Sequence, residues 1–430
     1  MLYRFLSVCL LAVLLSFTGT ASAAGITNYN KLIGADFWMQ KNPAGEKLIM
    51  DENGLKAFNA QVRKKSASVP DLLNYPKTVN GAQLKANITN YDILLDELYL
   101  HGNKISDNYR KILRLQTNAE NIPSVVTPRY GVIVRRSSLR NLPTGEGLFY
   151  YAGDTDFDAL QETELDPGEP VIVLHQSANK FFYYIQSVNY SGWISTFDLA
   201  FTDEDTWRDF ADPDQFLVVT DANMTIKIGS EQVVYQQGSR LPLLQNTEVY
   251  KVLTPMRKKD GSLMKQELFI KKDNHSVHEG YLPYTSNNIL RSAFKFYGMP
   301  YGWGGMKKSV DCSSLIFNAY RTVGIILPRN ADEQEQSAGT SHNLSGLTDV
   351  QKKAELHKLM PGSGLYMDGH CMMYLGEIEN EAYCLHALGS YVNEKGQRAV
   401  TMKVVVSDLS LKRGSGESFL QALASAVEFK

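Results

Sequence analysis

Cys312 is the residue of this chain best suited to nucleophilic chemistry. It lies in the sequence YGWGGMKKSVDCSSLIFNAY (301–320), where a glycine-rich turn leads into apolar residues at helical spacing. Asp311 is a natural N-cap and Gly324 a natural stop, so we expect Cys312 in the first turn of a helix. Unpaired backbone N–H groups and the helix dipole favour a thiolate there. Gly304 and Gly305 would let the neighbouring backbone approach a substrate closely.

A buried structural role is the alternative for Cys312, because cysteine is among the most buried residue types. Two downstream histidines, His370 and His386, favour catalysis instead. They lie in strand-like segments at 370–376 and 382–387, which a polar turn joins into a hairpin. Antiparallel pairing would set both imidazoles side by side at one end of a sheet. A thiol nucleophile needs a base and an orienting partner, so we predict Cys312 as nucleophile, His370 as base and His386 as orienter.

The remaining cysteines, Cys371 and Cys384, are interpreted as packing residues. With Cys312 they make an odd total after the export signal described below, which suggests at least one free thiol. Strand alternation points the two side chains differently, so a bridge between them is not expected. A metal site built from them and the histidines lacks Cys-x-x-Cys or His-x-x-x-His spacing. We predict neither a metal nor a cofactor, and find no phosphate-binding loop or dinucleotide fingerprint.

Composition and the N-terminus indicate an exported globular protein. The 430 residues are 43% hydrophobic and 21% charged, with a net charge of −2 that gives no reason to expect nucleic acid as a partner. Residues 1–23 read as an export signal, with Arg4, an apolar run at 5–17 and the small residues ASA at 21–23. That run is too short to span a bilayer, and no membrane span is expected in the mature chain. We therefore expect the periplasm or cell wall as its location.

Changes in the spacing of apolar residues along the chain predict four parts after the signal. We expect a helical stabilising segment at 24–127, two small barrels at 128–205 and 206–285, and a final domain at 286–430. Helices are expected at 55–62, 91–100, 105–115, 288–297, 331–339 and 417–427. Strands are expected at 130–136, 169–175, 181–187, 192–195, 216–220, 239–244, 267–271, 280–283 and 400–406, besides the hairpin.

The motifs together resemble the NlpC/p60 family of cell-wall cysteine peptidases. They are YGWGG (301–305), DCSSL (311–315), LPR (327–329), Gln334, HCMMYLG (370–376) and HA (386–387), and the resemblance covers about 286–430. RSSLRNLPT (136–144), FDALQET (157–163) and GWI (192–194) resemble the first of two bacterial SH3-like domains found in some members. The fold class implied is multidomain α+β, with two SH3-like β-barrels before a papain-like peptidase domain.

This resemblance implies cleavage of peptidoglycan stem peptides between γ-D-glutamate and a diamino acid. It implies that Cys312, His370 and His386 form the triad, that Tyr301 and Ser313 line the substrate site, and that the Cys312 amide and the Tyr301 hydroxyl are oxyanion donors. We also assign Asp311 and Asn330 to substrate binding.

Similar enzymes with paired SH3-like domains act on stems with a free N-terminal L-Ala, whose amine meets an aspartate after LPR. Asn330 occupies that place and offers no charge pairing, so Asp156 and Asp332 are candidates to supply the charge.

Two other functions remain open. The chain could be a non-catalytic wall-binding protein, although such a protein has no need to keep all three triad residues. It could also be an acyltransferase, because an acyl-enzyme is common to both reactions up to the second step. The expected partner is the murein tri- or tetrapeptide, and we expect a monomer.

Overall fold

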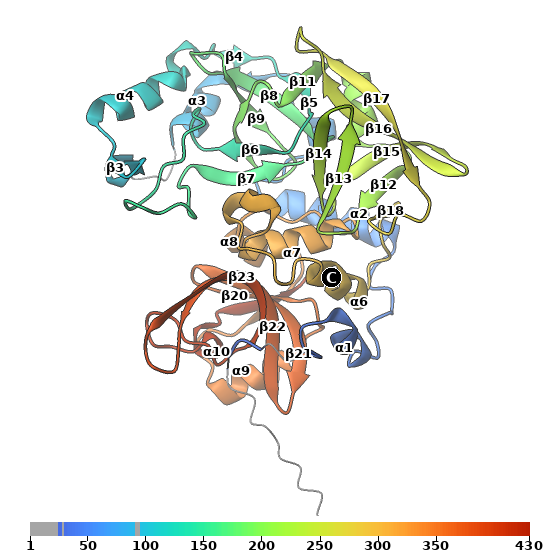
Figure 1. Cartoon of the computed structure of the whole chain (residues 1–430), viewed down its shortest axis with the longest axis vertical. Coiled ribbons are helices and arrows are strands. Elements are labelled where there is room, and N and C mark those ends of the chain that lie inside the picture. Colours follow the sequence, from blue (N-terminus) through green and yellow to red (C-terminus); the bar gives the residue numbers. More distant parts are fainter. Residues whose placement is uncertain (1–24, 28–29, 91–94) are drawn as a thin grey trace, which may run out of the picture.

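The structure is a computed structural model that describes residues 25–27, 30–90 and 95–430. Strands drawn in green and yellow form its upper part, and a sheet drawn in orange and red forms its lower part (Figure 1). The predicted signal at 1–23 lies outside the described residues, as does part of the helix predicted for 91–100. The described part of that segment is a 3-10 turn and a short strand. Among the described helices, none has the length and apolar character needed to cross a membrane.

The helices and strands of the described residues have the following bounds. The α-helices are α1 (Ala35–Gln40), α2 (Glu52–Lys65), α3 (Gly81–Thr89), α4 (Asp107–Gln116), α5 (Glu204–Ala211), α6 (Ser286–Phe294), α7 (Cys312–Arg321), α8 (Ala331–Glu335), α9 (Asp349–Leu356) and α10 (Phe419–Ala422). The 3-10 segments are η1 (Leu72–Asn74), η2 (Leu95–Glu97), η3 (Ala119–Asn121) and η4 (Trp303–Lys308). The strands are β1 (Val79–Asn80), β2 (Tyr99–Leu100), β3 (Asn103–Lys104), β4 (Val125–Val126), β5 (Arg129–Ile133), β6 (Ser137–Arg140), β7 (Gln161–Leu165), β8 (Pro170–Gln176), β9 (Phe182–Gln186), β10 (Ser191–Ser195), β11 (Leu199–Thr202), β12 (Phe216–Val219), β13 (Asn223–Ile228), β14 (Glu231–Gln236), β15 (Arg240–Asn246), β16 (Val249–Arg257), β17 (Leu263–Lys271), β18 (Val277–Glu279), β19 (Thr340–Asn343), β20 (Gly364–Met367), β21 (His370–Ile378), β22 (Glu381–Val392), β23 (Arg398–Asp408) and β24 (Ser425–Glu428).

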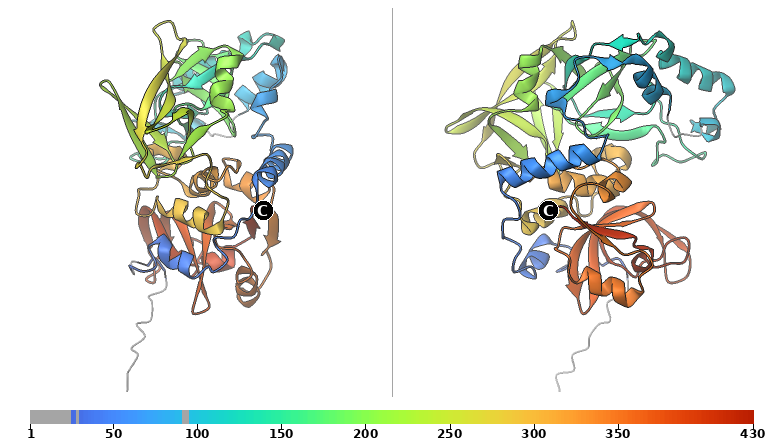
Figure 2. Two further views of the ribbon diagram at one scale, coloured as in Figure 1. Left: turned by 90° about the vertical axis from the view of Figure 1, so that its right-hand side faces the viewer. Right: turned by 180° about the vertical axis from the view of Figure 1, so that it is seen from behind.

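The segment before the first barrel divides between two partners. In its first half, α1 and α2 pack on the final domain: Trp38 is buried in that domain's core, and Asn59 hydrogen-bonds with the Gly324 carbonyl at 2.8 Å and the Ile326 N–H at 2.9 Å. The second half, from η1 to β4, packs on the first barrel, where Leu84 shares a core with two buried tryptophans. Figure 2 shows α2, in blue, lying along the junction between the upper and lower parts.

The first barrel is a seven-stranded antiparallel sheet in the order β11-β5-β8-β9-β10-β6-β7. The four strands predicted here correspond to β5, β8, β9 and β10. β6, β7 and β11 were not predicted: β6 and β7 have polar sequences, such as QETEL in β7, and β11 is a short segment of four residues, LAFT. β7 is nevertheless the strand that faces the candidate site described below.

The second sheet has the order β17-β16-β15-β12-β18, beside a separate hairpin of β13 and β14. The strands predicted at 216–220, 239–244 and 267–271 fall on β12, β15 and β17. The strand predicted at 280–283 is wrong: β18 pairs with β12 earlier, and the Leu282 N–H instead donates to the Thr322 carbonyl at 2.9 Å. The chain leaves the sheet there to join the final domain.

The final domain is a six-stranded sheet in the order β19-β24-β20-β21-β22-β23 with helices on both faces. α6 and α7 cover one face, where Leu315 packs with Met373 and Leu385. α9 and α10 cover the other. The final helix predicted for 417–427 is right only for α10 at 419–422, because 425–428 form β24 and pair with both β19 and β20. The chain is a multidomain α+β protein, which confirms the predicted fold class.

A buried polar network joins the two barrels to the final domain. The Arg136 guanidinium contacts Asp166 at 2.5 Å, Gln236 Oε1 of the second barrel at 3.2 Å and the Gly305 carbonyl at 3.1 Å. Arg321 at the end of α7 also reaches Asp166, at 3.4 Å. Because these charges are buried, their mutual contacts hold all three parts in one orientation.

Candidate active site

Helix α7 begins at Cys312 because the residues around it form a capping box. Asp311 Oδ1 accepts the Ser314 N–H at 2.9 Å, and Ser314 Oγ accepts the Asp311 N–H at 2.8 Å. Cys312 therefore occupies the first helical position, beside unpaired N–H groups and the positive end of the helix dipole. The predicted start of this helix is confirmed.

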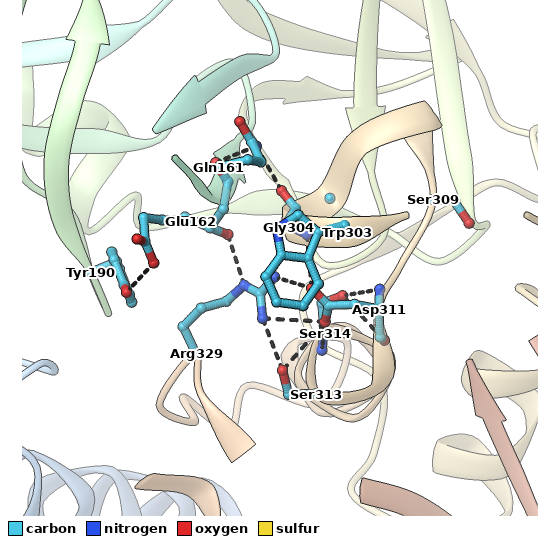
Figure 3. A network of polar contacts seen from close by, with 12 residues as sticks. Gln161, Glu162, Tyr190, Trp303, Gly304, Ser309, Asp311, Ser313, Ser314 and Arg329 are labelled. Carbon is cyan, nitrogen blue, oxygen red and sulfur yellow. Dashed lines mark hydrogen bonds and ion pairs between the residues drawn. The ribbon is translucent and has the colours of Figure 1, made fainter. Parts of the chain in front are cut away.

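Asp311 is also the buried partner of Arg329 (Figure 3). Its Oδ2 accepts from Arg329 at 2.5 Å and from the Gly304 N–H at 3.0 Å. Arg329 also donates to Ser313 Oγ and to Thr163 Oγ1 of β7, both at 2.9 Å. Burial alone would raise the pKa of Asp311, but the charge and hydrogen bonds of Arg329 hold that pKa below its ordinary value. The polar atoms of Asp311 and Ser313 are thus engaged within the protein.

The two histidines lie side by side on the hairpin of β21 and β22. His370 Nε2 is 2.8 Å from His386 Nδ1, and His386 Nε2 is 3.0 Å from Ser407 Oγ on β23. The Phe419 ring packs against both imidazoles, with centroids 5.9 Å apart in each case. Burial, with a smaller contribution from the charge of His370, lowers the pKa of His386 well below its ordinary value. His386 is therefore neutral at physiological pH.

Cys312 packs against the core cluster that includes Cys371. The interaction with Cys371 is the largest of several influences, His370 among them, that together hold the pKa of Cys312 well below its ordinary value, although burial opposes them. Burial raises the pKa of Cys371 well above its ordinary value, so that group stays a protonated thiol. Cys384, in contrast, lies on the other face of the sheet, with its sulfur 3.4 Å from Met372 Sδ. All three cysteines are free.

An aromatic cluster borders the nucleophile. Tyr301 is 7% exposed, and its ring lies 5.7 Å from that of Phe157, which precedes β7 in the first barrel. Phe157 also packs on Trp303 at 5.6 Å. Burial, together with the nearby Cys312, raises the pKa of Tyr301 well above its ordinary value. Its hydroxyl therefore stays protonated and can donate a hydrogen bond.

Gly304 and Gly305 serve the interface with the first barrel, not close approach of a substrate as the sequence suggested. Both have positive φ, 54° and 84°. A Cβ on Gly304 would lie 2.5 Å from Gln161 Cγ, and one on Gly305 would lie 3.1 Å from Glu164 Cβ. The Gln161 amide also donates to the Gly304 carbonyl at 2.9 Å (Figure 3). Glycine is needed here because β7 packs directly on this turn.

An acidic residue of the first barrel, Glu162, lies near the loop that carries Asn330. The Tyr190 hydroxyl donates to Glu162 Oε2, and Asn141 donates to the other oxygen. Burial and the charge of Glu162 raise the pKa of Tyr190, while Asn330 lowers it slightly. Burial also raises the pKa of Glu162, whose side chain is half-buried. The Asn189 side chain donates to the Leu327 carbonyl at 3.2 Å and so holds this loop of the barrel against the LPR segment.

The two acids considered from sequence have other surroundings. Asp156 forms an ion pair with Lys307 at 2.5 Å. Asp332 is exposed on α8. Both acids therefore differ from Glu162, whose carboxylate accepts a hydrogen bond from Tyr190.

Sequence comparison places this site within a known family. Residues 298–408 match the NlpC/P60 family, and residues 148–195 match the SH3 domain of SH3b1 type. The chain carries an NlpC/P60 domain. That domain contains Cys312, His370 and His386, and the SH3 match falls on the first barrel. Kinship between the two barrels stays a prediction.

Two peptidases are similar to parts of this chain. The chain is 25% identical over 202 residues to a gamma-D-glutamyl-L-lysine dipeptidyl-peptidase of Bacillus cereus. The aligned stretch covers 44% of this chain and 54% of that protein. The chain is also 25% identical over 233 residues to dipeptidyl-peptidase 6 of Lysinibacillus sphaericus, covering 52% of this chain and 80% of that one. The chain thus spans about half the length of the first of these relatives.

A solved structure shares the arrangement of nearly the whole chain. An NlpC/P60 endopeptidase from Photobacterium damselae subsp. piscicida superposes with a TM-score of 0.72, covering 90% of this chain and 94% of that one at 20% identity. At this identity the likeness establishes the fold.

Several residues of the site were not found by sequence reasoning: Cys371, Ser407, Phe419, Glu162 and Tyr190. Cys371 follows His370 directly, but strand alternation gave no sign that both side chains reach Cys312. The others belong to elements whose place in the site follows only from the tertiary fold. Among the described residues, no group of three or more His, Cys, Asp or Glu side chains is placed to hold a metal ion.

Proposed function

We propose that the chain is an exported cysteine peptidase that cleaves the bond between γ-D-glutamate and a diamino acid in peptidoglycan stem peptides. The observation that carries the proposal is the set of contacts from His370 to His386 at 2.8 Å and from His386 to Ser407 of β23 at 3.0 Å, with Cys312 at the start of α7. The name of the Bacillus cereus relative, a γ-D-glutamyl peptidase, supports the choice of bond.

In this mechanism Cys312 is the nucleophile and His370 the acid and base. The Cys312 thiolate attacks the carbonyl carbon of the γ-glutamyl bond, and the carbonyl electron pair moves to oxygen. The helix N-terminus and the protonated Tyr301 hydroxyl stabilise this oxyanion. As the carbon–nitrogen bond breaks, His370 gives its proton to the leaving amine. Water, deprotonated by His370, then attacks the thioester and restores the thiolate.

His386 and Ser407 orient the base. Because His386 is neutral, it carries one proton, and with that proton on Nε2 it donates to Ser407 Oγ at 3.0 Å. Its Nδ1 then accepts the Nε2–H of His370 at 2.8 Å. This arrangement orients the His370 ring and leaves its Nδ1 for Cys312. Asp311 and Ser313 act through Arg329 to hold the start of α7.

The proposed substrate carries a free N-terminal L-Ala whose ammonium meets Glu162. Glu162 accepts a hydrogen bond from Tyr190, whose pKa Asn330 influences. It lies on β7, the strand whose Thr163 accepts a hydrogen bond from Arg329. Asn330 would accept a further hydrogen bond from the ammonium, while Glu162 supplies the charge that Asn330 lacks. The same acid excludes a glycan-linked stem, whose alanine nitrogen is a neutral amide.

The test compares two peptides with the purified mature chain. L-Ala-γ-D-Glu-meso-diaminopimelate and its N-acetylated form are incubated separately, and mass spectrometry identifies the products. We expect release of L-Ala-γ-D-Glu from the free amine only, and a loss of at least roughly 1,000-fold in Cys312→Ala.

Three results would count against parts of this proposal. Equal cleavage of both peptides would remove the amine site and favour intact wall as the substrate. Transfer of the acyl group to an added amine in preference to water would favour an acyltransferase. If neither peptide is cleaved, and the parent chain and Cys312→Ala bind wall fragments equally well, a wall-binding protein is favoured.

A further inference from the structure

We propose that Cys371 is a resolving thiol, which forms a reversible disulfide with the nucleophile Cys312 when a peroxide oxidises the site. The proposal concerns an oxidised, resting form of the enzyme, and it goes beyond the reaction proposed above. It concerns only the chemistry of two neighbouring thiols, so it can be tested without any peptidase substrate.

The two thiols lie on facing elements of the final domain. Cys312 is the first residue of α7, and Cys371 is the second residue of β21, whose backbone pairs with Tyr366 of β20. Cys371 belongs to the core cluster that includes Leu315 of α7, and Cys312 packs against the same cluster. Cys371 is the largest influence on the pKa of Cys312, which agrees with this placement. A disulfide would therefore join two elements that already pack on each other.

The two cysteines differ in access to an oxidant. Cys312 is partly exposed, whereas Cys371 is fully buried. The thiolate is the form that reacts with peroxide, and the contacts of Cys312 favour its thiolate while burial keeps Cys371 protonated. Oxidation therefore begins at Cys312, and Cys371 acts only in the second step.

The chemistry balances with hydrogen peroxide as the oxidant. The Cys312 thiolate attacks one oxygen, the O–O bond breaks, and after proton transfer the products are Cys312 sulfenic acid and water. The Cys371 sulfur then attacks the sulfenic sulfur, the S–O bond breaks, and the Cys371 proton leaves with the hydroxide as a second water. In sum, two thiols and one peroxide give one disulfide and two waters. A dithiol reductant reverses the change by thiol–disulfide exchange.

The third cysteine does not compete for this bond. Cys384 lies on the opposite face of the sheet, in the cluster with Met372, and its sulfur faces Ser407 Oγ at 3.6 Å. The consequence of the Cys312–Cys371 pair is protection, because a sulfenic acid without a resolving thiol continues irreversibly to the sulfinic and sulfonic acids.

The experiment follows thiols by mass. The mature chain is treated with hydrogen peroxide, the remaining thiols are blocked with N-ethylmaleimide, and a non-reducing digest is analysed. We expect a cross-linked peptide pair joining Cys312 to Cys371, lighter by two hydrogens than the separate peptides, with only Cys384 blocked. Dithiothreitol should restore both thiols.

Two variants make the result specific. In Cys384→Ser the cross-link should form as in the parent chain. In Cys371→Ser, whose side chain is close in size, Cys312 should instead reach the sulfinic or sulfonic acid, and dithiothreitol should not restore it; circular dichroism checks that this variant is folded. Cys312 trapped only as a sulfenic acid in the parent chain, or oxidised irreversibly despite Cys371, would overturn the proposal. Neither outcome depends on whether the stem peptide is cleaved.

Discussion

The Arg329 guanidinium and the Asp311 carboxylate form an ion pair at 2.5 Å, with side chains only 4% and 7% exposed, beneath the first turn of α7. The same guanidinium reaches Thr163 in the first barrel, so one residue connects the helix cap of the nucleophile to another domain. The position of Cys312 thus depends on the contact between the two domains as well as on its own helix.

Arg329→Met should strongly destabilise the final domain. The change leaves the Asp311 carboxylate buried without its cation, which costs about 3–5 kcal/mol. Arg398→Met is the matched control, because the Arg398 side chain is exposed and hydrogen-bonds with Ser390 Oγ on the neighbouring strand; it should cost under about 0.5 kcal/mol. Urea unfolding followed by circular dichroism measures both. Equal midpoints for the two variants would contradict the structural role of the pair.

The alkylation of Cys312 should depend on pH in a defined direction. Its pKa is well below the ordinary thiol value, so the thiolate persists at neutral pH and reactivity is lost only as pH falls through that lowered pKa. In Cys371→Ser the strongest of the influences that lower the pKa changes, and the inflection should move towards higher pH. Rates of iodoacetamide labelling at Cys312, read by mass spectrometry, give both curves. Superimposable curves would show that Cys371 does not influence the thiolate.

Glu162→Gln should weaken binding of the free-amine peptide. Loss of the charge should raise KM roughly 10- to 100-fold while kcat changes little, because the carboxylate is not a reacting group. Asp156→Asn removes a charge from the same barrel that is paired with Lys307, and it should leave KM near the parent value. Steady-state kinetics on L-Ala-γ-D-Glu-meso-diaminopimelate measure the difference. A larger effect from Asp156 would place the amine elsewhere.

Gly304→Ala should disturb the contact between the first barrel and the final domain. Its φ of 54° is strained for alanine, and the added Cβ would lie 2.5 Å from Gln161 Cγ. We expect a loss of about 1–3 kcal/mol. Gly414→Ala is the control, because that glycine has open space around its Cβ position. Thermal unfolding measures the Tm of both variants. Equal Tm values would show that the contact between β7 and this turn does not stabilise the protein.

Much of the site follows from local sequence. Asp311 and Ser314 fix the start of α7, and the hairpin around residues 377–381 brings His370 to His386, because capping and hairpin pairing act over a few residues. The motifs also indicated the NlpC/P60 domain correctly.

The rest depends on contacts between segments far apart in the chain. β7 has a polar sequence and is a strand because it pairs with β6, and the packing of the barrel on the final domain then brings Thr163 to Arg329 of the LPR segment. Residues 425–428 have a helix-compatible pattern but become β24, because two neighbouring strands offer backbone partners. The sequence by itself indicated which residues are proposed to carry the chemistry. The tertiary structure decided that Thr163 of another domain meets Arg329 and that Cys371 lies in the core against which Cys312 packs, since burial and long-range pairing outweigh local preference.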